Sequence, residues 1–356
     1  MDPGYALHVS AGALRSLSRA RPITRVLDDN SVTPEQARKL RLVLRVRAFA
    51  EEHLGLHVAR AYSKYEDNAR RPVAWSVSAA HRDRLEAYRW NYPIIGRYEA
   101  RGFFDPKPAQ REAERLRQKG LDVLIARVDG FSTLGMLPDP VRASNLKLDD
   151  IELVILILHE LTHNTIYKPN DTLFNETMAA FVGRAAAIRF YEESFGPDSA
   201  EAAAARKHVA NLGVIDDYVI DLHTQLVELY AEAIARDEKL RRREAIFRAH
   251  RDAFATMYAP RLSNPRRWSG MTRVATTNAT ILAAHRYHAG QNVFQAVLDG
   301  LNGDLVQMLA VLSKAARKRD SQAFLRGIAD ADQPPGATAP AGHASLPALQ
   351  SQGQTP

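Results

Sequence analysis

The chain contains His159-Glu160-Leu161-Thr162-His163, followed twelve residues later by Asn175-Glu176. On an α-helix, residues four apart lie about 40° apart in azimuth and about 6 Å apart along the axis, so the imidazoles of His159 and His163 can converge on one ion. Catalytic zinc sites use three protein ligands, and two histidines with a glutamate are an established set. Glu176 is the natural third ligand, so this stretch predicts one Zn²⁺ per chain.

Glu160 adds a base to the predicted metal site, because it projects from the same side of the helix. Zinc lowers the pKa of its water towards about 7 and polarises a substrate carbonyl. Glu160 would accept the proton of that water as it attacks the carbonyl. The motif therefore predicts a zinc-dependent hydrolase with Glu160 as general base.

The preceding segment, residues 148–158, places the motif on a buried helix. Asp149 and Glu152 form an Asp version of the capping box, which marks a helix start. Between Ile151 and Leu158 only Glu152 is polar, as in a helix buried nearly all round, and buried histidines need polar partners. The run is far shorter than the roughly 20 residues that span a bilayer, so no transmembrane segment is expected. A second helix, capped by Asp171 or Thr172 and running to about residue 193, carries Glu176.

The other patterns predict an α+β fold that is predominantly helical. Strands are expected over residues 73–78, 92–99 and 122–128. Helices are expected from Pro34 to about Gly55, over 107–119, over about 199–211 and 216–256, and again from near Asn278 after a loop at 260–270.

Several segments make the chain resemble the bacterial predicted aminopeptidases, a zincin family with a glutamate third ligand. Beside the HELTH motif, these segments are Gly4-Tyr5 with residues 20–23, 101–105, 131–135, Tyr167 with 171–179, and 277–279. The likeness runs from about Gly4 to about Ala316. It implies that His159, His163 and Glu176 bind zinc and that Glu160 is the base. It also implies a zincin-like fold, in which a small mixed sheet precedes the HExxH helix and a helical C-terminal half.

In zincins of this kind, a Tyr or His from the later helical half usually meets the transition-state oxyanion together with zinc. The resemblance makes Tyr287 the first choice for this role, with His285 and His288 as alternatives. A tyrosine at helical spacing is also common in a hydrophobic core, and that interpretation stays open.

Substrate contacts are less clearly marked in the sequence. Zincins pair an extended peptide with an edge strand, and Phe131–Gly135 is the candidate edge, with a Gly-terminated turn as the alternative. Asp129 and Asp139 are candidates to hold a substrate ammonium, or ordinary turn residues. Exopeptidase and endopeptidase action both stay open.

Composition excludes some classes of function. The chain has 356 residues, no cysteine and a net charge of +7, so thiol catalysis and cysteine zinc sites are excluded. The basic runs at 239–243 and 314–319 lack interleaved aromatic residues, so we expect solvated helix faces and no nucleic-acid site.

We predict a metallopeptidase domain over residues 1–330, with a sheet-containing part at about 1–148 and a helical part at about 149–330. Residues 331–356 are predicted to be a disordered tail. The start of the chain lacks the pattern of a signal peptide, and this favours a cytoplasmic location. The resemblance instead predicts the periplasm or cell envelope, with envelope association if a signal or lipid anchor was trimmed.

The predicted activity is hydrolysis of peptide substrates, as an aminopeptidase by resemblance. The alternatives are a non-catalytic envelope or scaffold protein with a structural zinc site, and a zinc hydrolase of non-peptide amides. Glu160 favours catalysis, because a structural zinc site does not need a residue that is not a ligand.

Overall fold

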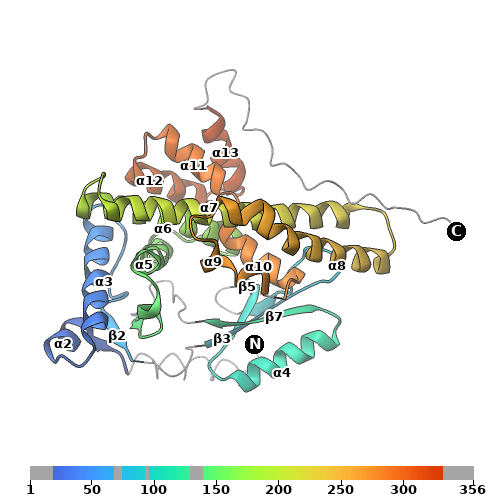
Figure 1. Cartoon of the computed structure of the whole chain (residues 1–356), viewed down its shortest axis with the longest axis horizontal. Helices are drawn as coiled ribbons and strands as arrows, with labels where there is room; N and C mark the ends of the chain where they lie inside the picture. Colours follow the sequence, from blue (N-terminus) through green and yellow to red (C-terminus); the bar gives the residue numbers. More distant parts are fainter. Residues whose placement is uncertain (1–18, 68–73, 93–95, 129–138, 274, 332–356) are drawn as a thin grey trace.

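Helix α5 (Asp150–Thr165), which carries the HExxH motif, packs against α6 (Thr172–Phe195) in the main hydrophobic core (Figure 1). The computed structural model describes residues 19–67, 74–92, 96–128, 139–273 and 275–331. Helix α3 (Pro34–Glu52) flanks α5 in the same core. The fold is α+β and predominantly helical, as predicted.

The other helices surround this pair. They are α2 (Ile23–Asp28), α4 (Pro106–Gln118), α7 (Ala200–Ala231), α8 (Arg236–Ala253), α9 (Pro265–Trp268), α10 (Asn278–His288), α11 (Gln291–Gly300), α12 (Leu305–Ala316) and α13 (Ser321–Ala331). Figure 1 shows α11, α12 and α13 gathered on one side of α6, with α10 and the sheets on the other. Helix α6 is therefore a central element that many others contact.

Local signals explain where the main helices begin. The Asp149 side chain accepts a hydrogen bond from the Glu152 backbone N–H at 2.8 Å, and the Glu152 carboxylate accepts one from Asp149 N–H at 3.4 Å. The predicted capping box of α5 is thus complete. Of the two caps predicted for α6, Asp171 is the one that accepts from a backbone N–H, that of Phe174, at 3.1 Å.

The described strands form small sheets before the motif. They are β1 (Arg21–Pro22), β2 (Lys64–Glu66) and β8 (Val141–Arg142) in the first sheet, β6 (Ala100–Phe103), β3 (Ala74–Ala80) and β7 (Asp122–Val128) in the second, and β4 (Trp90–Tyr92) and β5 (Gly96–Tyr98) in the third. In the first sheet, β2 pairs antiparallel with β1 and parallel with β8. The second sheet is antiparallel, and α4 covers one of its faces in a core of its own.

Several predicted boundaries are wrong. Residues 92–99 are not one strand, because β4 and β5 pair with each other antiparallel, with Asn91 opposite Arg97. Helix α7 does not end near 211 but continues through Gly213 to Ala231, and the helix predicted over 216–256 is instead broken at residues 232–235, before α8. A glycine inside a helix costs about 1 kcal/mol, and here the burial of Val214 and Ile215 against the end of α8 and the segment after it offsets that cost. The predicted loop at 260–270 also contains the short helix α9.

A buried carboxylate joins the antiparallel sheet to two helices of the second half. Asp122, at the start of β7, accepts hydrogen bonds from the Arg243 guanidinium of α8 at 2.8 Å and from the Asn278 backbone N–H of α10 at 3.0 Å. The predicted solvated face is therefore wrong for Arg243, which is only 2% exposed. Its burial is tolerated because a carboxylate pairs with the guanidinium.

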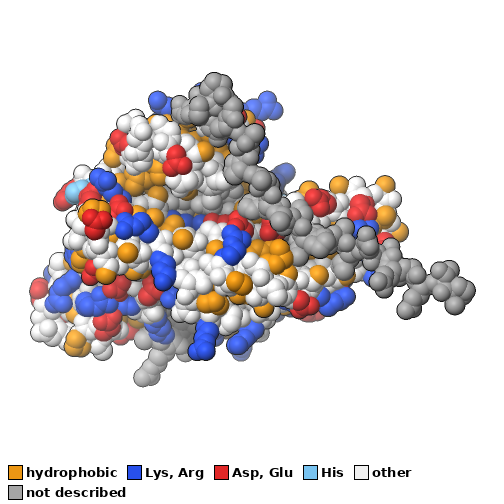
Figure 2. Space-filling view, turned by 45° about the horizontal axis from the view of Figure 1, so that its top comes forward, with side chains coloured by type: hydrophobic (Ala, Val, Ile, Leu, Met, Phe, Trp, Pro, Cys, Tyr) orange, Lys and Arg blue, Asp and Glu red, His pale blue; other side chains and the backbone are white. Residues whose placement is uncertain are grey.

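Charged side chains of both signs share the surface. On the face drawn in Figure 2, Lys and Arg side chains are interspersed with Asp and Glu side chains. In the basic run at 239–243, Arg241 pairs with Glu238 and Arg242 with Glu232, each at 2.5 Å. Among the helices that the structure describes, none has the length and apolar character needed to cross a bilayer.

Candidate metal centre

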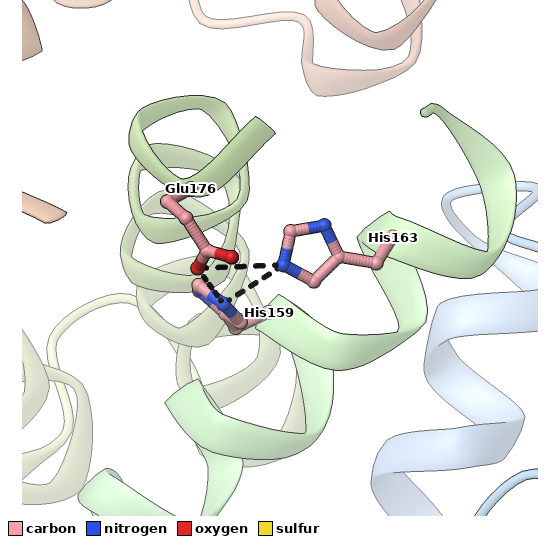
Figure 3. Close-up of side chains that lie close together, drawn as sticks. All are labelled: His159, His163 and Glu176. Carbon is pink, nitrogen blue, oxygen red and sulfur yellow. Dashed lines mark hydrogen bonds and ion pairs between the residues drawn. The ribbon is translucent and has the colours of Figure 1, made fainter. Parts of the chain in front are cut away.

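Three donor side chains meet where α5 passes the first turns of α6. The Nε2 atoms of His159 and His163 are 3.1 Å apart, and the Oε2 atom of Glu176 lies 3.5 and 3.7 Å from them, respectively. Figure 3 shows the two imidazoles and the carboxylate pointing toward one another from the two helices. The structure thus brings together the three residues predicted as ligands. In the described part of the chain, they are the one group of His, Asp and Glu side chains placed to hold a metal ion.

These separations fit a zinc ion. Tetrahedral coordination with bonds of about 2.0–2.2 Å places ligand atoms about 3.3–3.6 Å from one another. The observed spacings of 3.1 to 3.7 Å bracket that range. Two nitrogens and one oxygen are also a donor set that zinc accepts, so the residues present fit the ion.

The turn between α5 and α6 fixes the position of Glu176. Asn175, which is 3% exposed, accepts a hydrogen bond from the Lys168 backbone N–H and donates one to the Lys168 carbonyl, both at 2.8 Å. This pair of bonds holds the end of the connection against the first turn of α6. The adjacent Glu176 then faces the two histidines. The sequence prediction gave Asn175 no role, although its place next to the ligand could have indicated one.

Electrostatics keep the carboxylate donor in its ionised, ligand-competent form. Burial raises the pKa of Glu176, but hydrogen bonds from His159 and His163 outweigh it, so that the pKa lies well below its usual range. The carboxylate is therefore ionised at neutral pH. Burial lowers the pKa of His163, but the hydrogen bond and charge of Glu176 give a net upward shift. The cluster thus concentrates negative charge on Glu176, which favours a bound cation.

Glu160, the predicted base, is half-buried beside the first histidine on α5. A general base must not itself be a metal ligand, and Glu160 is not one of the three converging donors. Its charge contributes to raising the pKa of Tyr62 and of Tyr98, although burial is the larger cause for both. The charge of Glu176 also contributes to raising the pKa of Tyr98, which lies at the end of β5. Sequence reasoning missed Tyr98, because only the packing of β5 brings it near the cluster.

Tyr287 lies beside one of the three donors, His159. Its ring centroid is 6.1 Å from that of His159, and the residue is 41% exposed. The charge of Glu176 is the largest cause that raises the pKa of Tyr287 well above its usual value. The two alternatives have other partners. His285 stacks on His223 with ring centroids 3.8 Å apart, and His288 bonds to Asp216 at 2.5 Å.

The predicted substrate contacts are only partly described. Phe131–Gly135 and Asp129 lie outside the described residues. Asp139 is 4% exposed, and its carbonyl accepts a hydrogen bond from the Tyr62 backbone N–H at 2.7 Å. Tyr167, between α5 and α6, and Leu173, in the first turn of α6, are 37% and 39% exposed.

The fold and the site define a predominantly helical α+β protein with a candidate His-His-Glu metal centre. The family described as "Putative aminopeptidase" matches residues 4–324, which is most of the chain. The chain belongs to this family, which confirms the family resemblance. No curated protein and no solved structure matches the chain.

Proposed function

We propose that the protein is a zinc-dependent hydrolase of peptide bonds that acts as an aminopeptidase. The observation that carries the proposal is the convergence of His159, His163 and Glu176, with Glu160 next to the first of them on the helix. The name of the family supports a peptidase. A zincin-like assignment of the fold is part of the same proposal.

The mechanism follows from the chain's own side chains. His159, His163 and Glu176 would hold the ion, which when bound supplies a Lewis acid beside the substrate carbonyl. Glu160 would accept a proton from the attacking water and later return one to the leaving amine. Tyr287, kept protonated by the nearby Glu176 charge, would donate a hydrogen bond to the oxyanion.

Glu160→Gln is expected to abolish peptide cleavage while zinc binding is kept, because the amide cannot act as a base but preserves the side-chain shape. The assay is mass-spectrometric cleavage of a mixed peptide library by the zinc-loaded wild type and variant. Cuts one residue from the N-terminus would identify an aminopeptidase, and internal cuts an endopeptidase. Glu193→Gln, on the outer end of α6, is the matched control and should cleave normally.

Two results would contradict this expectation. Cleavage by Glu160→Gln at the wild-type rate would remove Glu160 from the mechanism. No cleavage by either protein, with zinc bound to both, would favour a structural zinc site in a binding or scaffold protein.

Tyr287→Phe is expected to lower turnover at least about tenfold with metal content unchanged, because it removes one hydrogen bond to the oxyanion. The variant keeps the ring that packs against His159, so the change isolates the hydroxyl. Steady-state kinetics and zinc analysis of the same samples provide the measurement. Unchanged turnover would assign the ring to packing alone.

A further inference from the structure

Gly183 of α6 lies against the backbone of α5 at His159, one of the candidate metal ligands. A Cβ atom added at Gly183 would lie 2.9 Å from the carbonyl oxygen of Ile155 and 3.2 Å from both the backbone nitrogen and the Cβ of His159. The first separation is shorter than real Cβ contacts, and the atom in the way belongs to the backbone. No side chain can therefore turn aside to make room.

The crowded atoms belong to the turn of α5 that carries the first donor. In an α-helix, the backbone N–H of His159 bonds to the carbonyl of Ile155, so Gly183 lies over this hydrogen bond. Gly183 and Glu176 are seven residues apart on α6, which places them about 20° apart in azimuth and about 10 Å apart along the axis. The same face of α6 thus directs Glu176 toward the two histidines and, two turns later, places Gly183 against the backbone of His159.

We propose that Gly183 is a positioning residue for the metal centre, which sets the distance between α5 and α6 at His159. This inference rests on the proposed metal site. The absence of a side chain at Gly183 lets the two backbones approach until the His159 imidazole reaches the Glu176 carboxylate, with Nε2 and Oε2 3.5 Å apart. A methyl group at this position would force the helices apart beside His159 and widen the donor set.

The neighbouring positions separate this role from general core packing. Ala187, one turn further along the same face of α6, is also fully buried but lies eleven residues, about three turns, beyond Glu176. Gly213, inside α7, is a second helical glycine, and a Cβ atom added there would meet nothing within 4 Å. The two residues therefore offer matched controls, one for strain in the same core and one for the change from glycine to alanine.

The test compares Gly183→Ala with Gly213→Ala and Ala187→Ser in the full-length protein. Zinc affinity is measured by chelator competition, and the geometry of the site by the visible absorption spectrum of the Co²⁺-substituted protein. We expect Gly183→Ala to weaken zinc binding roughly 10- to 100-fold, as changes to groups that orient metal ligands do, and to alter the Co²⁺ spectrum. Gly213→Ala should match the wild type in zinc affinity and spectrum, and Ala187→Ser should lower the thermal midpoint without changing zinc affinity or the spectrum.

Because the added methyl group can impair folding of the metal-free protein, Gly183→Ala is also refolded with Co²⁺ present. Wild-type zinc affinity and spectrum in Gly183→Ala would overturn the proposal. So would a Gly183→Ala protein that stays unfolded with metal while Ala187→Ser folds, since Gly183 would then serve overall packing. The readouts do not involve hydrolysis. A wild type that binds zinc without cleaving peptides would therefore refute the proposed activity and leave the role of Gly183 standing.

Discussion

Glu176→Gln is expected to weaken zinc binding by more than about 100-fold and to abolish peptide cleavage. Groups that only orient metal ligands already contribute about 10- to 100-fold, and Glu176 supplies a donor atom itself. The substitution keeps the side-chain shape but removes the negative charge that balances the cation. The hydrogen bonds that lower the pKa of Glu176 show how strongly the two histidines favour that charge.

The measurement is zinc affinity by chelator competition, with Glu192→Gln as the control on the same helix. Glu192 pairs with Arg206 at 2.6 Å near the far end of α6, so its variant should bind zinc normally. Equal affinity in Glu176→Gln and the wild type would show that the carboxylate is not a ligand. The two histidines would then be the only ligands left of the proposed three.

Asp216→Ala is expected to lower the free energy of unfolding by about 3–5 kcal/mol, because it leaves a buried guanidinium without its partner. Asp216 of α7 bonds to Arg184 of α6 at 2.6 and 3.1 Å and to His288 of α10 at 2.5 Å. Asp216 and Arg184 are buried. The Asp216 carboxylate thus bonds both to α6, which carries Glu176, and to the end of α10, which carries Tyr287.

Urea unfolding of Asp216→Ala and of its neighbour variant Asp217→Ala measures this effect. Asp217 pairs with Arg261, whose side chain is 49% exposed, so we expect its variant to lose about 1 kcal/mol or less. Similar losses of unfolding free energy in the two variants would contradict the importance of the bonds that Asp216 makes. A larger loss in Asp217→Ala would contradict it as well.

The convergence of the three candidate donors could be predicted from the sequence because its determinants are local. Two donors are one helical turn apart, and the third follows a short connection on the next helix. The caps at Asp149 and Asp171 likewise act within three residues of themselves. Short-range rules of this kind need no knowledge of the rest of the fold.

The features that could not be predicted depend on contacts between distant segments. A glycine inside α7 looks like a helix end, yet burial of the residues beside Gly213 keeps the helix intact. The basic run at 239–243 looks solvated, yet Arg243 pairs with a carboxylate 121 residues earlier in the chain. The role proposed for Gly183 likewise has no sequence signal, because a glycine in a helix does not reveal which backbone lies against it.

The short connection between α5 and α6 has a consequence for the order in which the site assembles. Loop-closure entropy rises with the number of residues enclosed, and only sixteen residues separate His159 from Glu176. By contrast, the bond between Asp122 and Asn278 spans 156 residues. During synthesis, every donor of the cluster has been made once α6 is complete, whereas Tyr287 follows about a hundred residues later. The three candidate donors can therefore come together before the residue proposed to bind the oxyanion exists.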